Sequence, residues 1–317
     1  MEIRFVASPI GLANVPLLIL APSLAPNLVG WHTNVSQMFD PFKGITFKHE
    51  GTKVYNLKSP LGMKKYFKKN SPQLLFFFAQ LLIKFNSDGK RVLLISKEAF
   101  IPLCIEKLNQ YLGHFGSSLR VVKIPKKGEE ELLESPNTVP IIHYGIEGIN
   151  QFEEYDAAFC LNSYNGKTDV LSHHLQQYFP LDIEHSWKRT SDGEHVARVT
   201  GFGRFQRPEV ESLAASVGKY YETTVVEQAI GRVRPFTRPR IIITQQRSRL
   251  ALPYDEEFTS LQAMRKFFDV PSMRKIRSSK TQQRVRDARR RGLTQKQVAA
   301  ETGLSVRTVK RCDRREK

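Results

Sequence analysis

Short apolar runs alternate with longer helical segments over most of this 317-residue chain, and this alternation is what most constrains the fold. Strands are expected at 91–95, 119–124, 139–144, 157–161 and 240–244. Helices are expected at 99–112 and at about 208–230, with a polar stretch at 184–194. Strands separated by helices form parallel sheets, because a parallel connection must cross the sheet. The pattern therefore predicts an α/β body built on a parallel sheet.

Composition indicates a folded, water-soluble chain, with 40% apolar and 25% charged residues. The longest apolar run, Leu74 to Ile83, is about half the roughly 20 residues that span a bilayer, so it predicts a core helix and no membrane partner. The three cysteines are scattered without CxxC spacing, and the eight histidines show no ligand spacing. We expect no disulfide framework and no metal site, and a cytoplasmic location.

The positive charge is concentrated at the C-terminal end. From Ser272 to Lys317 there are 16 Lys and Arg against four Asp and Glu, which is +12 of the total charge of +18. Pro271 stands where this composition changes and marks a domain boundary. Such a charge indicates a polyanionic partner, and DNA is the expected one.

Three short helices are expected in this basic region. The first covers 281–291 and is closed by Gly292. Thr294 and Gln297 form a capping box that opens the second, and Gly303 ends it. Ser305 then caps the third helix.

The last two of these helices resemble the helix-turn-helix family over about 22 residues. Its small residue and its turn glycine match Ala299 and Gly303, and its apolar positions match Val298, Leu304, Val309 and Cys312. The resemblance implies that the third helix enters the major groove of DNA. The residues it would present are Ser305, Val306, Arg307, Thr308, Lys310 and Arg311. The alternative is a small helical bundle that contacts protein.

Two segments of the body contain residues that indicate a function in addition to the fold. The first contains Gly145, Gly148 and Asn150 directly after a predicted strand. The second contains Gln228, Gly231 and Arg232, at the end of a helix and just before the last strand. Glycine-rich turns let backbone N–H groups approach phosphates, and arginines supply charge to a transferring phosphoryl group.

Together and in this order, the two segments resemble the fifth and sixth motifs of superfamily 2 (DEAD/DEAH-like) helicases, of the kind found in plasmid and phage-type replicons. The resemblance covers about 46–248 and implies a second RecA-like domain of the P-loop NTPase type. It also implies phosphate binding by Gly145, Gly148, Asn150 and Gly231, and catalytic roles for Gln228, Arg232 and Arg234. Pro235 stands where the family has its second arginine, so the arginine finger stays open between Arg232, Arg234 and Arg238.

A complete Walker A loop is missing from the sequence. The nearest approach is Gly166-Lys167-Thr168, where Leu161 replaces the first glycine. The run from Val15 to Ser23 resembles the end of a first RecA-like domain. We therefore expect the C-terminal half of a helicase, split from its partner half or left by truncation, with ATP and Mg²⁺ shared with a Walker A-bearing partner and not bound by this chain alone.

These expectations divide the chain into four parts: a leading segment at 1–45, the RecA-like domain at 46–248, a helical linker at 249–271 and the helix-turn-helix domain at 272–317. The leading functional hypothesis is a helicase-type DNA-binding protein whose ATPase needs a separate half. A second is a stand-alone DNA-binding or regulatory protein with a vestigial RecA-like fold. A third is an independent nucleotide-binding enzyme that uses Gly166 to Thr168.

Overall fold

The computed structural model describes residues 48–124, 135–146, 151–164, 184–189, 195–200, 222–246, 250 and 252–314. The chain divides into two compact units, and the boundary between them lies between Leu261 and Gln262. Each unit is described by itself. The proposed leading segment 1–45, the loop 166–168 and the residues Gly148 and Asn150 lie outside the described residues.

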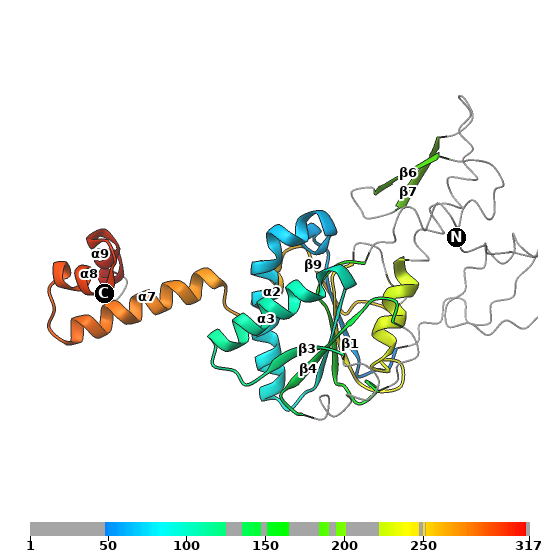
Figure 1. Ribbon diagram of the computed structural model, residues 1–317, viewed down its shortest axis with the longest axis horizontal. Coiled ribbons are helices and arrows are strands. Elements are labelled where there is room, and N and C mark those ends of the chain that lie inside the picture. Colours follow the sequence, from blue (N-terminus) through cyan, green and yellow to red (C-terminus); the bar gives the residue numbers. More distant parts are fainter. Residues whose placement is uncertain are drawn as a thin grey trace, which may run out of the picture. The chain divides into compact units, whose positions relative to one another are not determined.

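A parallel sheet of seven strands forms the body of the first unit (Figure 1). Its order is β3-β4-β2-β5-β8-β1-β9, and every pairing is parallel. The strands are β1 (Lys53–Leu57), β2 (Val92–Ser96), β3 (Arg120–Lys123), β4 (Thr138–His143), β5 (Ala157–Cys160), β8 (Ile241–Thr244) and β9 (Glu256–Phe258). The predicted α/β class with a parallel sheet is confirmed.

Two of the seven strands differ from the sequence prediction. Strand β1 was not expected, and β9 lies in the stretch 249–271 that was predicted as a helical linker. Both are at one side of the sheet, where β1 pairs with β8 and β9 pairs with β1. The sheet therefore extends beyond residue 248. Residues such as Lys53, Asn56 and Glu256 gave these short strands too polar a sequence to be recognised as sheet.

Helices cover both faces of the sheet. On one face lie α2 (Lys64–Ser87) and α3 (Ile101–His114), which contact each other through the rings of Phe76 and Tyr111. From α2, Phe78 and Phe85 pack on Phe159 of β5. Two short 3-10 helices, η1 (Pro60–Gly62) and η2 (Glu98–Phe100), precede α2 and α3.

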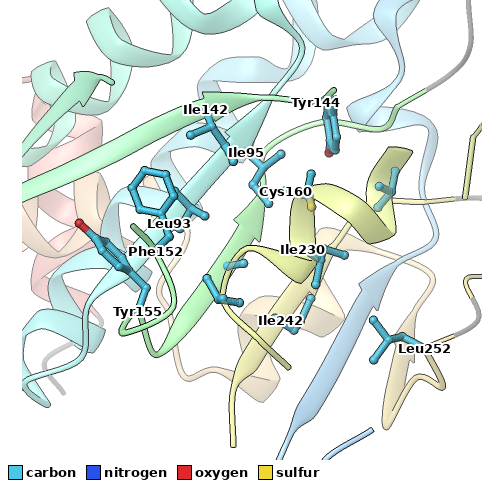
Figure 2. Packing of buried hydrophobic residues seen from close by; sticks show 14 of the residues in the cluster. Leu93, Ile95, Ile142, Tyr144, Phe152, Tyr155, Cys160, Ile230, Ile242 and Leu252 are labelled. Carbon is cyan, nitrogen blue, oxygen red and sulfur yellow. The ribbon is translucent and has the colours of Figure 1, made fainter. Parts of the chain in front are cut away.

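The opposite face is covered by a helix whose described part spans 222–231. Figure 2 shows Ile230 of this helix between Cys160 and Ile242 of the sheet. Because side chains alternate along a strand, Cys160 faces this helix while Phe159 faces α2. All residues of β2 and β5 are buried, as expected for central parallel strands.

A second sheet consists of two antiparallel strands, β6 (Glu184–Arg189) and β7 (His195–Thr200). They fall in and beyond the stretch 184–194 that the sequence marked only as polar. Their register pairs Glu184 with Thr200 and Arg189 with His195.

The second unit contains three helices that share one small core. They are α7 (Met273–Arg290), α8 (Gln295–Thr302) and α9 (Val306–Arg314), and α6 (Leu261–Phe267) precedes them. The core residues are Val285, Ala288, Val298, Ala299, Val309 and Cys312, with Leu293 and Leu304 packed against them. Helix α7 begins earlier than the predicted start at residue 281.

The turn between α8 and α9 follows the sequence expectation. The Thr294 hydroxyl accepts from Gln297 N–H and the Gln297 side chain accepts from Thr294 N–H, so the capping box is present. Gly303 has φ +67°, a left-handed conformation that favours glycine. These local features give two helices separated by a tight turn.

Helix α2 contains Pro72 in its interior, and a neighbouring hydroxyl offsets the lost backbone hydrogen bond. Pro72 has no N–H to donate to the carbonyl of Lys68, four residues earlier. The Ser71 hydroxyl, which is buried, donates to that carbonyl at 3.1 Å. The carbonyl is thus satisfied without the proline.

We predict that Ser71→Ala lowers the free energy of unfolding by about 1 kcal/mol, because the Lys68 carbonyl loses its donor. In a Pro72→Ala background the N–H of Ala at position 72 can donate to the Lys68 carbonyl. Ser71→Ala should therefore lower the free energy of unfolding by less in this background. Urea denaturation of the four chains, followed by circular dichroism, measures the difference. Equal losses in both backgrounds would contradict this explanation.

Candidate functional site

The first candidate segment begins where β4 ends. Gly145 has φ +79°, so the chain turns there in a conformation that glycine adopts without strain. An ideal Cβ built on Gly145 meets no atom within 4 Å, so this requirement comes from the backbone and not from crowding. The described part of the segment ends at Ile146.

The second candidate segment closes the helix at 222–231. Gln228 is exposed on this helix, and Gly231 is half-buried at its last residue. The turn that follows carries Arg232, Arg234 and Arg238 and leads directly into β8. The predicted position of this segment, at a helix end before a strand, agrees with the structure.

A hydrogen bond joins the two segments, although 86 residues separate them in the sequence. Nη2 of Arg232 donates to the carbonyl oxygen of Ile146 at 2.6 Å. The Arg232 side chain is half-buried and lies directly beside the loop that follows β4. The arginine Arg232 and the glycine turn at Gly145, which belong to two distant segments of the sequence, thus lie together in the fold.

The other two arginines point to acidic side chains at the surface. Nε of Arg234 lies 3.7 Å from a carboxylate oxygen of Glu153, and both side chains are about half exposed. Nη1 of Arg238 donates to Glu154 at 2.6 Å. Arg234 also has φ +55°, a conformation uncommon for residues other than glycine. The geometry therefore distinguishes Arg232, which contacts the backbone of the other segment, from Arg234 and Arg238.

Arg240 is a residue of this region that the sequence analysis missed. Its side chain is buried, with 7% of the residue exposed, and donates to three carbonyl oxygens. The partners are Val233 at 2.6 Å, Glu153 at 2.7 Å and Pro239 at 3.0 Å. Burial lowers the pKa of this guanidinium. Arg240 thus holds the arginine-bearing turn against the segment that precedes β5.

The residues just before β1 hold the same turn from another side. The Thr52 hydroxyl, completely buried, lies 2.9 Å from the carbonyl oxygens of both Pro235 and Arg238, which share its single proton. It also accepts from the N–H of Arg240 at 3.1 Å. Pro235 is therefore a buried part of a turn whose carbonyl oxygens have fixed partners.

A buried polar network lies between the C-terminal ends of β2 and β5, and the sequence gave no signal for it. These neighbouring strands lead to opposite sides of the sheet, which makes their ends a topological switch point. Asn162 accepts from Lys97 N–H at 3.0 Å and donates to the Ser96 hydroxyl at 2.6 Å. Its carbonyl accepts from the Tyr144 hydroxyl at 2.6 Å. Burial raises the pKa of Tyr144 well above its usual range, so this hydroxyl stays protonated as a donor.

The second candidate site is the outer face of α9. Val309 and Cys312 are buried, whereas Val306, Arg307, Lys310 and Arg311 are exposed. The predicted cap is present, because the Ser305 hydroxyl accepts from Thr308 N–H at 3.2 Å. Thr308 itself is half-buried and its hydroxyl lies 2.9 Å from that of Ser305, so it is less available than predicted.

A pairing between α7 and α9 fixes this face. Nη2 of Arg289 donates to Asp313 at 2.6 Å, and Gln295 donates to the same carboxylate at 3.0 Å. The Arg289 hydrogen bond lowers the pKa of Asp313. Asp313, the acidic residue in the described part of α9, is therefore paired within the unit, so the outer face of α9 keeps its positive charge.

Neither a metal-ligand cluster nor a membrane-spanning helix is found in the described part of the chain. Among its residues, no group of three or more His, Cys, Asp or Glu could hold a metal ion. No helix in this part has the length and apolar character needed to cross a bilayer.

Comparison with known proteins gives a likeness to solved structures but not to a family. No protein-family model matches the sequence, and no curated protein matches it significantly. One of the solved structures that match is described as an XPD helicase, with a TM-score of 0.40 and 14% identity over 78% of this chain. The match spans 40% of that chain.

We predict that Arg240→Met lowers the free energy of unfolding by about 2–3 kcal/mol, because buried carbonyl oxygens lose charged donors. The matched control is Arg238→Met, which removes an exposed ion pair and should leave stability unchanged within error. Urea denaturation of both variants measures this contrast. Similar stability of the two variants would show that Arg240 does not hold the turn.

Proposed function

We propose that this chain is a helicase-type DNA-binding protein that contributes the second RecA-like domain of an ATP-dependent DNA helicase. The Walker A and Walker B elements would come from another domain. The observation that carries the proposal is the hydrogen bond between Arg232 and Ile146, because it brings the two helicase-like segments into contact. A role in plasmid or phage-type replication and a cytoplasmic location belong to the same proposal.

The chemistry proposed for this site is electrostatic. A guanidinium group stabilises negative charge on a transferring phosphoryl group and can act from one domain into the nucleotide site of another. Arg232 is the residue proposed for this role, and Gln228 is exposed on the same helix end for contact with the nucleotide. The turn at Gly145, continued by Gly148 and Asn150, is proposed to place backbone N–H groups toward phosphate. ATP and Mg²⁺ are proposed to be shared with a Walker A-bearing partner domain and not bound by this chain alone.

The basic helical unit is proposed to be a helix-turn-helix that attaches the protein to DNA. In this arrangement α9 lies in the major groove, where its first residues contact bases and its basic side chains contact phosphates. The support is the exposed face of Val306, Arg307, Lys310 and Arg311, together with the turn at Gly303.

A second candidate function is a stand-alone DNA-binding or regulatory protein with a vestigial RecA-like fold. The observation that favours it is the pairing of Arg234 and Arg238 with Glu153 and Glu154, which occupies two of the three arginines. A third, an independent nucleotide-binding enzyme using Lys167, rests on residues outside the described part.

Nucleotide titration separates these three functions. We expect the full chain alone to bind Mg-ATP weakly and to support hydrolysis only with a Walker A-bearing domain. Arg232→Gln keeps a donor for Ile146 but removes the charge, so it should abolish that hydrolysis without unfolding the turn. Arg238→Gln is the control with the same loss of charge. Tight binding by the chain alone that is lost with Lys167→Ala would instead favour the third function, and a combined protein that never hydrolyses ATP would favour the second.

We predict that Arg307→Ala and Lys310→Ala each weaken binding of the full chain to duplex DNA by about 1–3 kcal/mol, because each removes a base or phosphate contact. Lys107→Ala, which changes a partly exposed lysine of α3, is the control with equal loss of charge and should leave affinity unchanged. Fluorescence anisotropy at several salt concentrations measures both affinity and its salt dependence. The logarithm of the affinity should fall steeply with the logarithm of salt concentration. Unchanged affinity in both α9 variants would remove this helix from the groove.

A further inference from the structure

The first two turns of α2 carry a cluster of lysines that neither candidate site uses. Lys64, Lys65, Lys68 and Lys69 are all exposed, and Tyr66 between them is 40% exposed. We call these five residues the α2 lysine cluster. Phe67, on the opposite side of the same turns, is completely buried and anchors this end of the helix, with its ring 4.8 Å from that of Phe100.

The lysines are not the ordinary solvent-facing side of an amphipathic helix. From Leu74 to Leu82, α2 is buried on nearly all sides. Leu75, seven residues after Lys68 and hence on the same side of the helix, is fully buried. The side that carries lysines is therefore exposed only at the beginning of α2, where it extends past the packed layer.

The arrangement of charges is unfavourable for the isolated fold. Lys64 and Lys68 are four residues apart, as are Lys65 and Lys69, and like charges at this spacing destabilise a helix. The first turn contains no acidic residue. None of the four lysines has an ion pair with an acid in the described part of the chain. A bound polyanion would turn this repulsion into attraction.

The cluster lies at the edge of the sheet where the strands end. Helix α2 follows β1 through η1, and the Gly62 carbonyl accepts from Ser163 N–H, just after β5, at 3.0 Å. In open α/β sheets, ligands bind outside the C-terminal ends of the strands. The lysine spacing of four residues advances about 6 Å along the helix, comparable to the separation of successive phosphates in an extended strand.

We propose that the α2 lysine cluster binds the backbone of single-stranded DNA, independently of α9. Lysines that follow a phosphate backbone next to an aromatic side chain on which a base can stack are typical of single-strand binding. The exposed hydrophobic side chain in the cluster is a tyrosine, with no larger apolar surface for insertion into a bilayer, so the cluster fits nucleic acid better than an anionic membrane. The choice of DNA over RNA rests on the proposed function.

The test uses the full chain with Arg307→Ala and Lys310→Ala, which removes the proposed α9 contacts. Binding to a fluorescent 20-mer of deoxythymidine should remain. Replacing Lys64 and Lys68 by Gln should weaken it at least tenfold, since two phosphate contacts are lost, and reduce its salt dependence. Tyr66→Ala should weaken it at least fivefold through loss of stacking. Because all three side chains are exposed and the lysines repel each other, these variants should unfold at the temperature of the parent or slightly above it.

The matched control replaces Lys84, near the far end of α2, and Arg120, at the start of β3 and hence at the opposite edge of the sheet, by Gln. This control removes the same charge from the same unit and should change affinity less than twofold. Equal weakening by both pairs of substitutions would overturn the proposal. Complete loss of 20-mer binding in the full chain with Arg307→Ala and Lys310→Ala would also overturn it.

Other ligands provide a further test. Binding to phosphatidylcholine vesicles with 30% phosphatidylserine, but not to the 20-mer, would assign the cluster to membranes and also overturn the proposal. A uridine 20-mer bound more tightly than the deoxythymidine 20-mer would overturn the assignment to DNA. Duplex binding through α9 is measured separately, so its failure leaves this test intact.

Discussion

Burial of the parallel sheet on both faces is the constraint on which the rest of the first unit depends. Strands β2 and β5 are buried throughout, between α2 on one face and the helix at 222–231 on the other. Such strands leave no side chains for chemistry along their length. The groups proposed to act in the body are accordingly found where strands and helices end, at the turn after β4, at the turn before β8 and at the beginning of α2.

The arginine-bearing turn shows how the fold positions these groups. Arg240 and Thr52 are buried and satisfy the carbonyl oxygens of the turn, so the backbone around Arg232 has few alternative conformations. A rigid turn reduces the entropy lost when a side chain meets a charged ligand. The residues that hold this turn in place are therefore different from the residues proposed to act from it.

The two basic surfaces have different structural origins. On α9 the basic residues lie opposite a buried stripe of Val309 and Cys312, so a regular amphipathic helix produces the exposed face. On α2 the lysines lie on a helix that is otherwise buried, and they are exposed only because its first turns extend past the packed layer. The first surface is evident from sequence periodicity, whereas the second needs the packing of the helix to be known.

Local rules of sequence were sufficient for much of this protein. Apolar runs predicted the central strands. Backbone conformation and helical spacing predicted the capping box, the turn at Gly303 and the buried positions of α8 and α9. All these features depend on residues that are neighbours in the sequence. Tertiary structure alone decided the rest. The strands β1 and β9 depend on partners far along the chain, and the contact between Arg232 and Ile146 joins residues 86 positions apart. The burial of Arg240 and the exposure of the α2 lysines depend on which surfaces the packed layers cover, and that is a property of the assembled fold.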